Sequence, residues 1–158
     1  MEISGTYSFN ASPERVWALL MDSAVISSCI PGCHALEPDG DNRFRARLTV
    51  AMAAITGTYD GVVTLSDFVP GASYRLTAEG QGRPGFVKGS ALIALRPDGA
   101  ATIVDVSGTV QTGGTIARLG QRLFGSVSKL MTDRFFGCLQ SKVETSNTRH
   151  RDTETPRN

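Results

Sequence analysis

The chain has 158 residues, a formal net charge of +1 at pH 7, 41% hydrophobic residues and 20% charged residues. These values are typical of one globular domain with a sizeable core, and they give no electrostatic reason to expect a nucleic-acid partner. No apolar run reaches the roughly 18 residues that a membrane-spanning helix needs. The first residues lack a basic start followed by an apolar stretch, so we expect no secretory signal and a cytoplasmic location.

The first elements are a strand and two short helices. Alternation over residues 3–9 predicts the strand. Ser12-Pro13-Glu14 predicts a helix start, with serine as the cap, proline at the first helical position and glutamate in the first turn. Asp22-Ser23 starts a second short helix, which Pro31-Gly32 ends.

Strands dominate the middle of the chain. Five segments between residues 43 and 111 alternate with period two, and the turn sequences between them are short. No connection is long enough for a crossover helix, which favours an antiparallel meander of hairpins.

After Gly113-Gly114, which give the chain room to turn, the period changes to three and four residues. This pattern predicts a long amphipathic helix over residues 115–143. Residues 145–158 are polar and are expected to form a disordered tail. We therefore predict one α+β domain over residues 1–144 with a helix-grip fold. A curved seven-stranded antiparallel sheet wraps around the long C-terminal helix, and two short helices follow strand 1.

The inward-facing strand positions are apolar, and many of them are very small. Native packing density needs large side chains, so such a sheet face either receives the helix closely or encloses an empty apolar space. We expect the second arrangement, with close helix packing as the alternative. The small residues are Ala46, Ala54, Gly61, Ala78, Gly80, Gly82, Gly89, Ala91 and Gly108.

The expected pocket would hold an apolar ligand by burial and by stacking on aromatic rings. For any one aromatic residue, core membership is as good an interpretation as ligand contact. The predicted ligand-binding residues are Trp17, Phe44, Leu48, Val50, Met52, Tyr59, Tyr74, Phe86, Gly89, Gly108, Leu119, Leu123, Phe124 and Val127.

Metal binding and catalysis are not expected. Cys29, Cys33 and His34 lie close in sequence, but a structural zinc site needs four ligands and no second pair is evident. An odd count of three cysteines argues against a disulfide framework, and we expect Cys29 and Cys33 to pack as small apolar residues. The strand carboxylates fall on the polar phase, so no pair converges on the pocket.

Arg43, Arg45 and Arg47 share the outer face of one predicted strand. Such a row is most often a solvated face that blunts aggregation. Binding of an acidic partner surface or anionic lipid is the alternative.

Several motifs together resemble the G-subunit family of carbon monoxide dehydrogenase, which belongs to the START/Bet v 1-like (SRPBCC) superfamily. They are Ala-Ser-Pro-Glu-Arg-Val-Trp at 11–17, Cys-Ile-Pro-Gly-Cys at 29–33, Gly-Phe-Val-Lys-Gly at 85–89, Gly-Gly-Thr-Ile-Ala-Arg-Leu-Gly at 113–120 and Arg-Phe-Phe at 134–136. The resemblance covers about residues 1–143.

The resemblance implies a non-enzymatic accessory protein that assists an aerobic molybdenum CO dehydrogenase or a related hydroxylase. It would act in membrane recruitment or in electron transfer, holding a quinone- or lipid-like molecule, with no cofactor required. Some relatives have an apolar membrane-attaching tail, whereas the tail here is polar. Peripheral contact at the inner face of the cytoplasmic membrane would then fall to the short helices. The alternatives are an assembly or recruitment factor with no functional ligand and a START-like enzyme acting on a hydrophobic substrate.

Overall fold

A computed structural model describes the backbone of residues 1–52 and 55–154, and side chains as far as residue 143. The described residues form seven strands, two short helices near the start of the chain, and a 3-10 helix that leads into a long helix at its end. In chain order these are β1 (Glu2–Phe9), α1 (Pro13–Leu20), α2 (Ser23–Cys29), β2 (Cys33–Pro38), β3 (Arg43–Val50), β4 (Gly57–Val69), β5 (Ser73–Gly82), β6 (Gly85–Asp98), β7 (Ala101–Gly114), η2 (Thr115–Leu119) and α3 (Gly120–Glu154).

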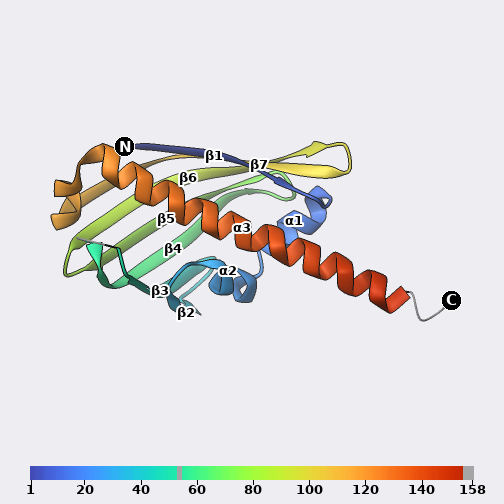
Figure 1. Cartoon of the computed structure of the whole chain (residues 1–158), viewed down its shortest axis with the longest axis horizontal. Coiled ribbons are helices and arrows are strands. Elements are labelled where there is room, and N and C mark those ends of the chain that lie inside the picture. Colours follow the sequence, from blue (N-terminus) through green and yellow to red (C-terminus); the bar gives the residue numbers. More distant parts are fainter. Residues whose placement is uncertain (53–54, 155–158) are drawn as a thin grey trace.

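The strands form one antiparallel sheet in the order β1-β7-β6-β5-β4-β3-β2. From β2 to β7 each strand pairs with the next one along the chain, and β1 pairs with β7. Helix α3 crosses the concave face of this sheet, and its C-terminal end extends past the sheet (Figure 1). The predicted helix-grip fold is therefore confirmed.

The two short helices begin where their capping residues predict. The Ser12 hydroxyl accepts a hydrogen bond from the Arg15 backbone N–H at 3.4 Å, and Pro13 is the first residue of α1. The Asp22 carboxylate accepts from the backbone N–H groups of Ala24 and Val25 at 3.0 and 3.3 Å. These bonds satisfy donors that a helix start leaves without partners.

The element boundaries differ from the prediction at the end of β3 and at both ends of α3. Strand β3 ends at Val50, because the chain turns away and the Met52 carbonyl accepts from the Ile55 N–H at 3.0 Å. The predicted inward position Ala54 lies outside the described residues. The long helix begins at Gly120, whose φ of +80° separates it from η2.

The helical backbone of α3 continues to Glu154, past the Val143 expected from the apolar stripe. Residues 155–158, the end of the predicted disordered tail, lie outside the described part. The domain boundary at residue 144 stays a prediction.

The main core lies at the end of the sheet that α1, α2 and the middle of α3 cover. Phe9, Val16, Val104 and Leu139 are at most 1% exposed. The ring of Phe136 packs edge-on against Phe9, with 6.3 Å between the ring centroids. Burial of these large side chains fixes α3 on the sheet at this end.

A second, smaller cluster lies at the start of α3. Ile55, Tyr59 and Ile116 are buried there, and Leu119 and Phe124 pack against them. The Tyr59 hydroxyl donates a hydrogen bond to the Ile55 carbonyl at 2.6 Å. The interior therefore consists of two packed clusters at opposite ends of the helix-covered face.

A disulfide joins Cys29 of α2 to Cys138 of α3. The expectation that Cys29 is unpaired is therefore wrong, and the free cysteine is Cys33, which is half-buried. The partners are separated by 109 residues. Only the packing of α2 against α3 brings them together, and no local sequence pattern reports that contact.

A polar link holds α3 to the edge strand β1. The Tyr7 hydroxyl donates to the Asp133 carboxylate at 2.9 Å, and its ring stacks on Phe136 at 4.3 Å. Lys129 donates to the same carboxylate at 2.8 Å. Burial and the Asp133 contact raise the pKa of Tyr7 to about 12. Hydrogen bonds from Lys129 and Tyr7 hold the pKa of Asp133 below its usual value.

Reduction of the Cys29–Cys138 bond is expected to lower the free energy of unfolding by about 2–4 kcal/mol, because the bond closes a long loop in the unfolded chain. Thermal melting with and without dithiothreitol measures this loss. The Cys33→Ser variant is the control and should melt like the parent protein in both conditions. A melting temperature that reductant does not change would contradict the bond.

The Tyr7→Phe variant is expected to lose about 0.5–1.5 kcal/mol of stability at neutral pH, because it removes one hydrogen bond. A carboxylate with a lowered folded-state pKa contributes stability above its unfolded pKa, and that contribution is lost as pH falls through the folded pKa. Since Tyr7 helps to lower the Asp133 pKa, Tyr7→Phe should lose less stability on acidification. Urea unfolding at a series of pH values tests this, with Ser4→Ala as a control on the outer face of β1. Parallel pH profiles for Tyr7→Phe and the parent protein would refute the link.

Candidate functional site

A cavity of about 380 Å³ lies between the concave face of the sheet and α3, between the two packed clusters. Helix α3 lies close to β1, α2 and η2, while the middle strands stay farther from it. The cavity follows from this spacing, because side chains on the middle strands are too small to reach the helix.

The sheet wall of the cavity is built mostly by β3, β4, β5 and β6, with further residues from β1 and β7. Small residues are frequent in it, as expected: Ala46, Gly61, Ala78, Gly80, Gly89 and Ala91. Gly80 shares the inward phase of Leu76 and Ala78, and a Cβ atom at Gly80 would meet no atom within 4 Å. This position borders open space rather than the helix.

The helix wall is one stripe of α3. Phe124, Val127, Ser128, Met131 and Thr132 recur at steps of one, three and four residues, and they face the cavity together. Ile116 of η2 and Ile55 close the end next to the second cluster.

Six of the predicted ligand-binding residues line the cavity. They are Leu48, Val50, Tyr59, Gly89, Phe124 and Val127. Their contact with a ligand stays a prediction.

Trp17 and Tyr74 belong to the main core instead. The two rings meet edge-on with 5.6 Å between centroids, and Tyr74 is 3% exposed. Met52 and Leu119 pack on the second cluster, at the end of the cavity rather than in its wall. Phe44 is half-buried on β3 and does not line the cavity.

Three other predicted residues are placed by backbone geometry. Phe86 lies on the outer phase of β6, is 47% exposed, and covers Gly113 of the paired strand. Position 108 requires glycine, because a Cβ atom there would collide with the Ser90 carbonyl of the neighbouring strand. Leu123 is 53% exposed on the outer side of α3.

Several wall residues are absent from the sequence-based prediction. Met131 continues the predicted apolar stripe of α3 from Phe124 and Val127, so the spacing alone is enough to include it. Ser128 and Thr132 share that stripe, but they are polar and give no apolar signal. Ile3 and Ile55 carry no signal that places them at the cavity, since tertiary contacts bring them there.

The cavity wall offers little acid–base chemistry. Burial raises the pKa of Tyr59, and its hydroxyl is bonded to the Ile55 carbonyl. Glu79 borders the cavity, but its carboxylate pairs with Lys88 at 3.5 Å, and both side chains are exposed on the outer face. His34 contacts Thr49 at 2.6 Å at an exposed position away from the cavity. Among the described side chains, no group of three or more His, Cys, Asp or Glu residues is arranged to hold a metal ion.

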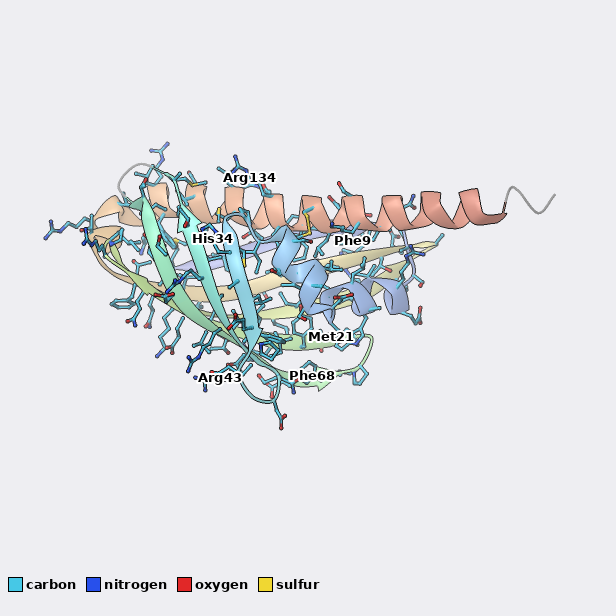
Figure 2. All side chains as sticks on the ribbon, turned by 90° about the horizontal axis from the view of Figure 1, so that it is seen from below. Phe9, Met21, His34, Arg43, Phe68 and Arg134 are labelled. Carbon is cyan, nitrogen blue, oxygen red and sulfur yellow. A yellow bond between two sulfur atoms is a disulfide. The ribbon has the colours of Figure 1, made fainter. Side chains whose placement is uncertain are left out.

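A second hollow, of about 780 Å³, lies on the outer face of the sheet. It is larger than the inner cavity, but charged side chains dominate its wall. Arg43, Arg45 and Arg47 all line it, as the shared phase predicts. Arg47 pairs with Asp60 at 2.9 Å, and the other two arginines share Asp39. Figure 2 shows Arg43 and many nitrogen-tipped side chains on the side of the sheet away from α3.

No helix within the described residues has both the length and the apolar character needed to cross a membrane.

Comparison with solved structures supports the fold assignment. A conserved protein from Geobacillus kaustophilus is 34% identical, with a TM-score of 0.90, and the match covers 92% of this chain and 97% of that one. A START superfamily protein from Mycobacterium smegmatis has a TM-score of 0.70 at 12% identity, covering 91% and 97%. An aromatase/cyclase from a Streptomyces species has a TM-score of 0.66 at 14% identity, covering 91% and 93%. The last two likenesses concern the fold alone.

A search of curated proteins gives no match. The family of the carbon monoxide dehydrogenase G-subunit (CoxG) matches residues 5–144, which is nearly the whole described domain. The motifs noted in the sequence fall within this range. The chain belongs to the CoxG family.

Proposed function

We propose that this protein binds an apolar, quinone- or lipid-like molecule in the cavity between the sheet and α3. The supporting observation is the wall itself, which is mostly aliphatic and aromatic and borders a cavity of about 380 Å³. Ligand pockets for small molecules commonly measure about 300–1,000 Å³. A long hydrocarbon tail would exceed this space and extend through the mouth.

In this proposal the protein acts by binding rather than by catalysis. General acid–base chemistry needs a titratable group within hydrogen-bonding reach of the substrate. The titratable side chains at the cavity are Tyr59, whose proton is engaged by Ile55, and Glu79, whose carboxylate faces outward to Lys88. Neither is poised to transfer a proton to a bound molecule. A START-like enzyme is therefore the weaker interpretation.

The proposed partner is an aerobic molybdenum CO dehydrogenase or a related hydroxylase. Support comes from the family, whose description names carbon monoxide dehydrogenase. The protein would serve that enzyme in electron transfer or in recruitment to the membrane, from a cytoplasmic position at the inner face. Leu123 and Leu130 are 53% and 41% exposed and lie seven residues apart, hence on one side of α3. They give the helix an apolar contact surface beside the cavity.

The second candidate is a recruitment factor with no functional ligand. The arginine row on β3 and the outer hollow would then carry the activity. The ion pairs to Asp39 and Asp60 reduce the charge that this face offers to an acidic partner. This weakens the candidate relative to ligand binding.

A cavity-filling substitution separates the two candidates. Gly80→Leu places a side chain in open space, with no backbone in its way. We expect it to weaken binding of the neutral fluorophore N-phenyl-naphthylamine about tenfold or more, because overfilling an apolar site costs on the order of 1–3 kcal/mol. Fluorescence titration of the full chain measures the affinity.

The matched control is Gly125→Leu, which adds the same side chain on α3 outside the cavity wall. It should bind the fluorophore like the parent protein. Thermal melting of both variants checks that the fold persists. Equal fluorophore affinity for Gly80→Leu and the parent would argue that binding occurs elsewhere.

A further inference from the structure

The helix wall of the cavity carries two hydroxyl groups in an otherwise apolar stripe. Ser128 and Thr132 stand one turn apart on α3, among Phe124, Val127 and Met131. The two hydroxyls differ in their hydrogen bonding. This difference affects which molecules can bind in the cavity.

Hydroxyl side chains in a helix commonly donate to the carbonyl four residues earlier. Thr132 does so to Ser128 at 2.8 Å, Ser126 to Arg122 at 3.2 Å and Ser141 to Gly137 at 3.2 Å. Within the described side chains, Ser128 makes no such bond and has no other protein partner for its hydroxyl. Ser128 is half-buried, and its hydroxyl is still open to solvent in the cavity. A bound molecule that displaces this water must replace its hydrogen bond, so the hydroxyl favours an occupant with a polar atom at that point.

The charge of the wall restricts the occupant further. Among the described residues that line the cavity there is no lysine, arginine or histidine. The one carboxylate, Glu79, is paired with Lys88 on the outer face. A carboxylate or phosphate group inside the cavity would lose its water and gain no counter-ion, and an unpaired buried charge is strongly disfavoured.

On the basis of the ligand site proposed above, we infer that the occupant is a neutral molecule with a hydrogen-bonding oxygen, and that Ser128 binds this oxygen. A ketone, quinone, ester or alcohol oxygen meets this requirement, whereas an ionised fatty acid or a phosphate headgroup does not. On the sheet wall Ser90 also borders the cavity, but its hydroxyl accepts a hydrogen bond from the exposed Arg75 guanidinium at 3.2 Å. Ser128 therefore sets both the chemistry and the position of the polar end of the ligand.

Three probes of similar size test this inference with the full chain. Acetylnaphthalene carries a neutral carbonyl, ethylnaphthalene has no oxygen, and naphthoate is anionic at neutral pH. Naphthalene fluorescence reports the affinity of each. We expect acetylnaphthalene to bind about 3- to 10-fold more tightly than ethylnaphthalene, as one net hydrogen bond provides, and naphthoate to bind least.

The Ser128→Ala variant should lose the preference for the ketone while keeping its affinity for ethylnaphthalene. Alanine is favourable in a helix, so the fold is retained. Ser126→Ala is the matched control, because its hydroxyl is bonded to Arg122 outside the cavity wall. It should keep the preference.

The remaining outcomes each overturn a distinct step. An unchanged ketone preference in Ser128→Ala would overturn the role of Ser128. Naphthoate binding as tightly as the ketone would overturn the requirement for neutrality. Failure of ethylnaphthalene and both other probes to bind would overturn the ligand site itself, and with it this inference.

Discussion

The structure depends on how α3 is held over the sheet: it is packed against other elements at its start and around its middle, and it stands away from the strands between these two regions. Toward the C-terminal side, Phe136 and Leu139 are buried, and the disulfide from Cys138 to Cys29 ties the helix to α2. At the other end, Ile116 in the preceding turn packs with Tyr59. Between these attachments the helix faces small residues that do not reach it. The cavity is the direct result, because a rigid helix spanning two fixed points cannot settle onto the strands below.

The same constraint explains which features can be predicted from the sequence. Three local signals predict the element order and the helix-grip fold. They are the alternation in the strands, the caps at Ser12 and Asp22, and the change of period after Gly114. The small inward residues Gly80 and Gly89 indicate the cavity. A glycine at an inward strand position is evident from the sequence alone, whichever element packs over that position. These signals depend only on neighbours along the chain, so they can be recognised without knowledge of the tertiary structure.

The disulfide and the core position of Trp17 and Tyr74 depend instead on tertiary contacts, whereas the position of Phe86 is a local matter. The disulfide between Cys29 and Cys138 depends on the packing of two helices far apart in the chain, and counting cysteines cannot detect it. Phe86 has a ring suited to stacking, although its strand phase already places it outside. Trp17 and Tyr74 pack on each other in the main core, and only tertiary contacts distinguish a core ring from a ligand-binding ring.

We propose that the cavity between the sheet and α3 holds a neutral, largely hydrocarbon molecule. Mass spectrometry of an organic extract of the purified full chain, made after native purification, tests this most directly. We expect one dominant neutral oxygen-bearing lipid or quinone in near-stoichiometric amount. An extract containing no such molecule, or one dominated by ionised fatty acids or phospholipids, would contradict it.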